Sequence, residues 1–271
     1  MAKNWFITGT SRGFGRLWAQ AALERGDKVA ATARSVDSLA ELVETHGDNV
    51  LPIALDVTDH DAVFAAVRQA HDAFGNLDVV VNNAGYGHFG MIEEVTEQEL
   101  RSQMEANFFG TFWVTQAALP YLRERGSGHI IQVSSIGGIT AFPTIGAYHA
   151  SKWAVEAFTQ SLAAEVAQFG VHVTAVEPGG YATDWAGASA KTSEPIHAYD
   201  ALRQAVRDDR ATEELGHPEA TAAVLLKLVD SPEPPTRIFF GSTPLPIAKT
   251  DYESRLATWE KWNDLAVEAR G

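Results

Sequence analysis

The chain has 271 residues, of which 45% are hydrophobic and 21% charged, and its formal net charge is −14. This acidic balance argues against non-specific binding to nucleic acid or to an anionic membrane surface, since both require basic patches. The absence of cysteine excludes disulfides and thiolate chemistry, and we expect no metal site. The chain shows no signal peptide and no apolar run near the ~18 residues of a membrane helix, so we expect a cytoplasmic protein.

Short apolar runs alternate with amphipathic segments along most of the chain. Strands are expected at residues 5–8, 28–33, 50–55, 77–81, 129–133, 171–176 and 237–240, with helices between them. This alternation predicts right-handed βαβ units and one α/β domain over residues 1–271, a Rossmann-like doubly wound parallel sheet of about seven strands. Residues 181–216 are expected to form a substrate lid. Residues 244–271 are expected to form a C-terminal helical extension, with its helix at 251–269 and an apolar stripe that packs against the domain or a partner subunit.

A glycine-rich segment follows the first strand and leads into a helix. Its glycines have the spacing G-x-x-x-G-x-G, and backbone N–H groups at such a turn, together with the helix dipole, can hold a phosphate. The alternative is a flexible loop between strand and helix. We expect this segment to cradle a dinucleotide through Gly9, Ser11, Arg12, Gly13, Phe14 and Gly15.

The residue after the second strand is expected to select the cofactor. A carboxylate there would accept hydrogen bonds from a ribose 2′-hydroxyl, whereas an arginine favours a 2′-phosphate. The chain has Arg34 at this position and Arg12 in the glycine loop. We therefore predict NADP(H) in preference to NAD(H). The alternative for Arg34 is a solvated surface arginine.

Tyr148 and Lys152 lie four residues apart in a helix expected over 147–168, so their side chains share one face. A fixed ammonium beside a phenol favours the phenolate and should lower the pKa of Tyr148 from about 10. Ser135 ends an apolar strand thirteen residues before Tyr148, where its hydroxyl could hydrogen-bond the same substrate oxygen. These three groups predict proton transfer to or from an alcohol or carbonyl oxygen. The tyrosine–lysine spacing alone is weak evidence, since it occurs by chance in many helices.

The motifs together resemble the short-chain dehydrogenase/reductase family. The resemblance extends from Trp5 to about Gly241, and residues 178–185 and 237–242 are similar to the hydroxysteroid and retinol dehydrogenase-like branch. The motifs occur in this order: Thr8-Gly9-x-x-x-Gly13-x-Gly15, Asp56-Val57, Asn82-Asn83-Ala84-Gly85, Asn107, Ser135, Tyr148-x-x-x-Lys152, and Pro178-Gly179 with Thr183.

The resemblance implies a role for each of these positions. Tyr148 would be the general acid in reduction and the base in oxidation, and Ser135 would orient the carbonyl. Lys152 would hydrogen-bond the nicotinamide ribose and lower the pKa of Tyr148, and Asn107 would position a water in a proton relay with Lys152. The resemblance also implies the contacts with the cofactor. Asp56 and Val57 would contact the adenine, and Asn83 and Gly85 the ribose on the adenosine side, where the small Ala84 leaves room. Thr183 would contact the carboxamide or the phosphates, with Pro178 and Gly179 nearby.

The expected reaction interconverts a ketone or aldehyde and an alcohol by NADP(H)-dependent hydride transfer. The substrate is expected to be neutral and hydrophobic, because no arginine or lysine stands among the predicted pocket residues Ser135, Ile136, Phe142, Tyr148, Tyr181 and Trp185. Two alternatives remain, a non-catalytic NADP(H)-binding sensor and an epimerase or dehydratase on the same fold. The segment after Phe240 leads to a polar helix rather than to the family's glycine-rich tail. Both a homodimer and a homotetramer are therefore open.

Overall fold

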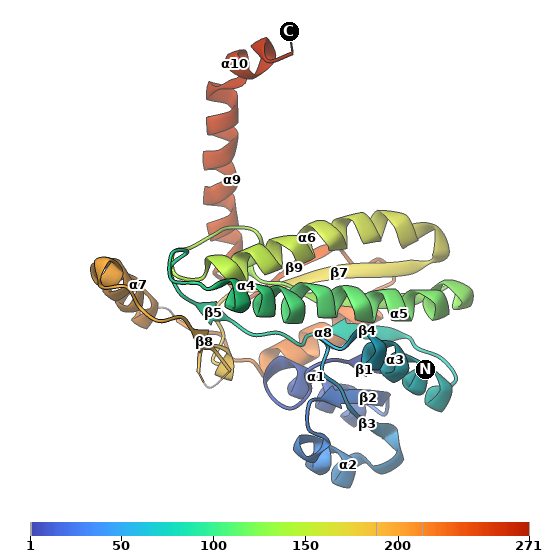
Figure 1. Ribbon diagram of the computed structural model, residues 1–271. Coiled ribbons are helices and arrows are strands. Elements are labelled where there is room, and N and C mark those ends of the chain that lie inside the picture. Colours follow the sequence, from blue (N-terminus) through green and yellow to red (C-terminus); the bar gives the residue numbers. More distant parts are fainter. Residues whose placement is uncertain (1, 188, 213, 271) are drawn as a thin grey trace.

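The computed structural model describes residues 2–187, 189–212 and 214–270. Its main sheet has seven parallel strands in the order β3-β2-β1-β4-β6-β7-β9, which confirms the predicted doubly wound sheet (Figure 1). The strand order reverses between β1 and β4, and ligands of such sheets bind at this point, beyond the carboxyl ends of the strands. The strands are β1 Asn4–Ile7, β2 Lys28–Ala33, β3 Val50–Ala54, β4 Val79–Asn82, β6 Gly128–Val133, β7 Val171–Pro178 and β9 Arg237–Phe240.

Helices cover both faces of this sheet, and the alternation of side chains along β1 shows why. Trp5 and Ile7 point into one apolar core, and Phe6 between them points into the other. The first core is closed by α1 Gly13–Glu24, α2 Ala40–His46 and α8 Ala220–Asp230. The second is closed by α3 His60–Phe74, α5 Gly110–Arg125 and α6 Gly146–Val166.

Several element boundaries differ from those expected. The fourth strand begins at Val79 rather than Leu77, although Leu77 is fully buried. The long helix over 96–125 divides into α4 Glu97–Met104, a π-helical turn η3 Glu105–Phe109 and α5. Short 3-10 turns are η1 Val36–Leu39, η2 Gly47–Asn49, η4 Ile136–Gly138, η5 Ala167–Phe169, η6 Asp184–Ala186 and η7 His197–Tyr199.

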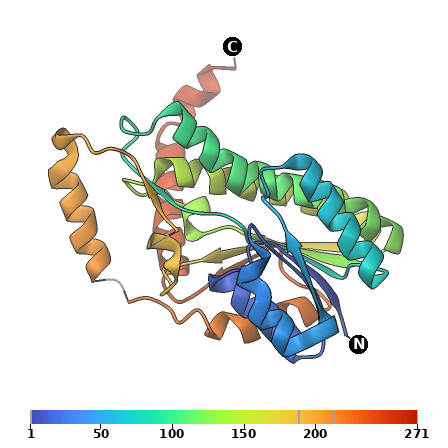
Figure 2. The same ribbon diagram turned by 60° about the horizontal axis from the view of Figure 1, so that its bottom comes forward.

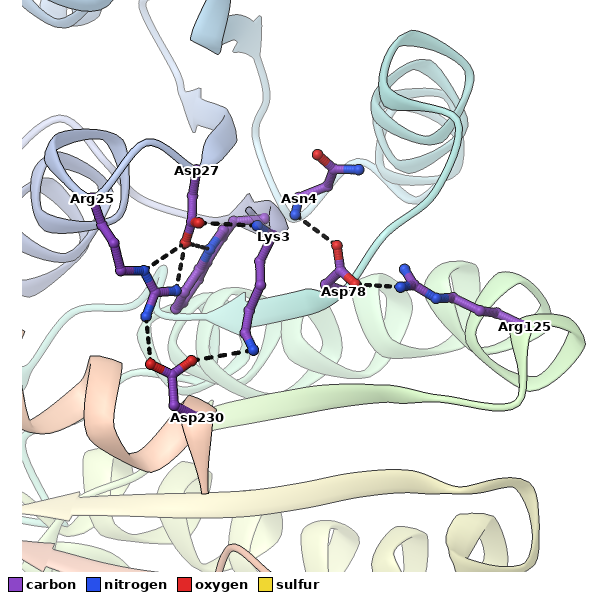
Figure 3. A network of polar contacts seen from close by, with 8 residues as sticks. Lys3, Asn4, Arg25, Asp27, Asp78, Arg125 and Asp230 are labelled. Carbon is purple, nitrogen blue, oxygen red and sulfur yellow. Dashed lines mark hydrogen bonds and ion pairs between the residues drawn. The ribbon is translucent and has the colours of Figure 1, made fainter. Parts of the chain in front are cut away.

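A polar network ties the amino ends of the strands together, at the end of the sheet opposite the carboxyl ends (Figure 3). Its centre is Asp27, which is 1% exposed and accepts hydrogen bonds from the Lys3 N–H at 2.9 Å and the Trp5 indole at 2.8 Å. Arg25 neutralises the same carboxylate. The other members are Asn4, Asp78, Arg125 and Asp230. A charged cluster with this many partners can be buried at low cost.

Two segments extend beyond the sheet and its helical layers. The first contains α7 Asp200–Ala211 and is anchored where β8 Lys191–Thr192 pairs with β5 His88–Phe89 (Figure 2). In the second, the C-terminal extension, the helix begins earlier than expected, with Pro244 in the first turn of α9 Pro244–Lys261, and a further helix follows Trp262 as α10 Asn263–Glu268. Figure 1 shows α9 projecting away from the sheet.

The apolar stripe of this extension does not pack against the domain. Leu256 is 51% exposed, Trp259 62% and Trp262 56%, so the expectation of packing within the chain is wrong. The alternative, a partner subunit, stays a prediction. Within the described residues no helix is both long and apolar enough to cross a membrane.

Candidate active site

A cavity of about 1290 Å³ opens at the carboxyl ends of the strands and brings together nearly all of the predicted site residues. Gly15 and Asn107 are the two predicted residues that do not line it. Those that do are Gly9, Ser11, Arg12, Gly13, Phe14, Arg34, Asp56, Val57, Asn83, Ala84, Gly85, Ser135, Ile136, Phe142, Tyr148, Lys152, Pro178, Gly179, Tyr181, Thr183 and Trp185.

The glycine loop forms one wall of this cavity, and Gly15 supports it from beneath. Gly9 and Gly13 have φ values of +70° and +59°, a region that side chains with a Cβ rarely adopt. A Cβ on Gly15 would lie within 2.5 Å of the Asn83 Nδ2 and closer still to the Gly9 carbonyl oxygen. Asn83 in turn donates to the carbonyls of Thr8 at 2.9 Å and Gly9 at 3.1 Å. The loop therefore holds its backbone close to whatever occupies the cavity.

The cavity wall beside this loop has the donors and acceptors that a dinucleotide requires. Arg34 is exposed at the end of β2, and Asp56, after β3, accepts from the Thr58 N–H at 3.0 Å and hydroxyl at 2.8 Å. Arg12 instead forms a salt bridge with Asp184, with an N–O distance of 2.8 Å. Arg34 is thus the better placed arginine for a 2′-phosphate. A glycine cradle, an exposed arginine and a carboxylate at adjacent strand ends fit an adenine dinucleotide.

Ser135, Tyr148 and Lys152 meet in the part of the cavity formed by η4 and α6. The Lys152 Nζ lies 5.8 Å from the centre of the Tyr148 ring and donates to the Val133 carbonyl at 2.7 Å. Ser135 accepts from the Gly137 N–H at 3.0 Å, which holds its hydroxyl at the start of η4. A phenol, an ammonium and a hydroxyl thus share one pocket, and together they can move a proton at a substrate oxygen.

The expectation that Lys152 lowers the pKa of Tyr148 is wrong for this structure. Burial raises the pKa of Tyr148 to about 12, and hydrogen bonding with Ser135 opposes this only in part. Burial also lowers the pKa of Lys152 to about 8, with Glu156 acting in the opposite direction. The phenol is therefore protonated at neutral pH, and the lysine begins to lose its charge just above it.

Two buried carboxyl groups lie behind this lysine. Glu156 is one helical turn beyond Lys152 on α6, and Glu177 is on β7; they are 4% and 2% exposed. Arg237 approaches both, at 3.5 Å and 3.9 Å. One arginine cannot compensate two buried carboxylates, and burial and mutual repulsion raise the pKa of Glu177 to about 8. The sequence analysis did not identify this pair.

Asn107 is fully buried, and its side-chain amide binds Tyr86 and Ser151. Its Oδ1 accepts from the Tyr86 N–H at 3.0 Å, and its Nδ2 donates to the Tyr86 carbonyl at 3.0 Å and to the Ser151 hydroxyl at 3.1 Å. The water relay from Asn107 to Lys152 stays a prediction. The amide positions the backbone at Tyr86, which lines the cavity.

The cavity also contains cations that were not predicted as pocket residues. Lys191, Arg207 and Arg210 line it together with Val206 and Leu215, all from the segment predicted as a lid, and the neutral substrate stays a prediction. The sequence of this segment predicts no strand and has no glycine motif. The signal that could have found them is the helical spacing of Arg203, Val206, Arg207 and Arg210, which repeats every three to four residues.

The comparisons with known proteins agree with this geometry. The family model described as short chain dehydrogenase matches residues 3–194. The oxidoreductase BOA17 of Botryotinia fuckeliana is 44% identical over 98% of this chain and 99% of its own length. A short-chain dehydrogenase from Streptomyces avermitilis superposes with a TM-score of 0.90 at 37% identity, over 99% of this chain and 98% of the other.

Further similar structures were solved with a nicotinamide dinucleotide, the class of cofactor that the cavity fits. An alcohol dehydrogenase of Thermococcus sibiricus, determined with 5-hydroxy-NADP, gives a TM-score of 0.74 at 29% identity over 90% of this chain and 98% of its own. Other neighbours were solved with NADP or NADH. The doubly wound sheet and its cavity thus define a dinucleotide-fold oxidoreductase. The chain belongs to the short-chain dehydrogenase family.

Proposed function

We propose that this protein is an NADP(H)-dependent reductase that converts a ketone or aldehyde to an alcohol by hydride transfer, with Tyr148 as the acid. The observation that carries the proposal is the shared cavity, which joins Ser135, Tyr148 and Lys152 to the glycine loop and Arg34. The resemblance to the hydroxysteroid and retinol dehydrogenase-like branch remains part of the proposal.

The cofactor, when bound, would supply the hydride. The glycine loop would hold its phosphates through backbone N–H groups, and Arg34 would pair with a 2′-phosphate. Tyr148, protonated at neutral pH because its pKa is about 12, would hold a proton at its phenolic oxygen and release it to the substrate oxygen. Ser135 would orient that oxygen. In the oxidation of an alcohol the same phenolic oxygen would take the proton back.

The test is oxidation of NADPH and NADH, measured in parallel against ketones of increasing size. Turnover with NADPH supports the reaction and the Arg34 argument together. Turnover with NADH alone would overturn the cofactor preference and leave the reaction standing. If both cofactors bind and no ketone is reduced, a non-catalytic dinucleotide sensor becomes the better interpretation.

We further propose that the protein is cytoplasmic and forms a homodimer across α5 and α6. Half-buried rings of Phe108, Phe112 and Phe158 meet there, with Phe112 and Phe158 centroids 5.0 Å apart. The exposed stripe on α9 would provide the second contact that a homotetramer requires. Sedimentation equilibrium measures the oligomeric state, and a monomer at micromolar concentration would contradict both the dimer and the tetramer.

A further inference from the structure

Three cations line the part of the cavity that the lid covers. Lys191 comes from β8, and Arg207 and Arg210 come from α7. Among the described residues none of the three forms a salt bridge, in contrast to Arg12, which pairs with Asp184. In a chain with a net charge of −14, positive side chains without acidic partners along a cavity wall indicate a binding site for an anionic ligand.

Two of these cations rest on aromatic rings. The Arg210 Cζ lies 5.1 Å from the centre of the Phe89 ring, and the Lys191 Nζ lies 5.0 Å from that of Tyr86. A cation over a ring face is held in place while its remaining N–H groups stay available as donors. Both side chains remain exposed to solvent, and these ring contacts restrict their motion.

A series of aromatic ring contacts connects Tyr148 to Arg210, one of these cations. The rings of Tyr148 and Trp185 are 4.9 Å apart, and those of Trp185 and Phe89 are 5.5 Å apart. Arg210 lies over the ring of Phe89. Ring contacts along Trp185 and Phe89 thus connect the proposed proton donor to a positively charged side chain.

The rest of the fold anchors the helix that carries two of these cations. Arg203, also on α7, pairs with Glu94 at 2.6 Å, and the Glu94 side chain is fully buried. Glu94 also accepts from the backbone N–H groups of Met91 and Ile196, each at 2.8 Å. Arg203 and these bonds hold the pKa of Glu94 down at about 2, so the anchor persists across the neutral range.

Acidic side chains line the same cavity and limit the positive charge. They are Asp56, Glu105, Asp184 and Asp209, of which Asp56 lies after β3, beside the glycine loop, and Asp184 is paired with Arg12. Asp209 is the remaining acidic group contributed by the lid within its described residues. The three cations therefore leave the lid side of the cavity with a net positive charge.

We propose that this end of the cavity binds an acidic group of the substrate, so that the substrate is an amphipathic carbonyl compound with an apolar body and a carboxylate or phosphate at the end remote from the carbonyl. The proposal rests on the proposed function, because it concerns the same cavity. It replaces the expectation of a neutral substrate. The acidic group interacts with Arg207, Arg210 and Lys191 while the carbonyl lies at Tyr148.

Binding of simple amphiphiles tests this without requiring turnover. Calorimetric titration of the full-length protein would compare decanoate and decyl phosphate with decanamide, which has the same apolar chain and no charge. We expect at least one anion to bind about tenfold or more tightly than the amide, with a difference that shrinks as salt rises. Whichever anion binds more tightly identifies the acidic group as carboxylate or phosphate.

Variants locate the site on the lid. The double substitution Arg207→Gln with Arg210→Gln should remove the preference for the anion and leave amide binding unchanged. Arg68→Gln with Arg123→Gln changes the net charge equally at exposed positions outside the cavity and should keep the preference. Equal binding of anion and amide, or a preference that survives in the lid variant, would overturn the proposal.

Turnover separates this proposal from the proposed function. Methyl ketones that carry a carboxylate at the opposite end would be compared with their primary amides. A lower KM for the acid in the wild type, lost in the lid variant, supports both. Equal reduction of acid and amide would overturn the acidic-group proposal and leave the reductase intact. Anion binding without reduction of any ketone would overturn the reductase alone.

Discussion

Asn107 encloses the backbone of Tyr86: its amide accepts from the Tyr86 N–H and donates to the Tyr86 carbonyl, each at 3.0 Å. The same amide donates to Ser151, whose hydroxyl donates to the Tyr148 carbonyl at 2.7 Å. One buried side chain thus links the segment after Asn83-Ala84-Gly85 to the helix that carries Tyr148. The π-helical turn around Asn107 directs the amide inward.

Replacing Asn107 with alanine should destabilise the protein and impair catalysis together. The change leaves the Tyr86 N–H without its acceptor, at a cost of about 1–3 kcal/mol where water cannot replace the amide, whereas the Tyr86 carbonyl keeps the Gln103 side chain as a donor. Urea denaturation would measure the free energy of unfolding, and steady-state kinetics would measure turnover. Gln116→Ala, at an exposed site on α5, is the matched control and should change neither. Wild-type stability and turnover in Asn107→Ala would contradict the positioning role.

Replacing Tyr148 with phenylalanine should abolish reduction while cofactor binding is kept. Loss of a general acid typically costs about 10²–10⁴-fold in rate, and the ring contact with Trp185 should survive the change. Turnover and NADPH titration on the same preparation separate the two effects. Tyr252→Phe removes an exposed hydroxyl on α9 and should change neither turnover nor NADPH binding. A fully active Tyr148→Phe enzyme would rule out Tyr148 as the general acid.

Reversing the charge at Arg34 should reverse the cofactor preference. In Arg34→Glu a carboxylate would accept hydrogen bonds from a ribose 2′-hydroxyl and repel a 2′-phosphate. We expect the KM for NADPH to rise about tenfold or more and the KM for NADH to fall. Lys227→Glu makes the same charge change on the exposed side of α8 and should leave both constants as they are. Equal affinities for the two cofactors in the wild type would already argue against the prediction.

The sequence predicts the parts of this site that depend on local pattern, and it misses those that depend on distant partners. Strands, the glycine loop and the tyrosine–lysine pair follow from periodicity and spacing over a few residues. Glu156 and Glu177 lie on different elements, and only the sheet brings them together. The cations of α7 line the cavity on a helix whose Arg203 binds Glu94, more than one hundred positions earlier in the chain. The pKa of Tyr148 likewise depends on burial, which spacing does not reveal.

The buried pair Glu156 and Glu177 should make the protein less stable as pH rises. The pKa of Glu177 is raised to about 8 from an ordinary value of 4.5, so the folded protein keeps a proton that the unfolded chain releases. Between these values the folded state binds more protons, and the free energy of unfolding falls with pH. The groups facing Glu177 are Glu156, Lys152 behind it, and Arg237.

Glu177→Gln replaces the protonated carboxyl with a neutral amide of similar shape and should flatten this dependence. Near pH 4.5 the variant should match the wild type, and by about pH 8 it should be the more stable protein, because the wild type must by then bury a second carboxylate beside Glu156. Thermal unfolding across this range measures the difference. Glu165→Gln, an exposed site on α6, controls for the loss of a charge. A constant gap between Glu177→Gln and wild type at all pH values would show that folding does not shift the pKa of Glu177, with Arg237 compensating both carboxylates.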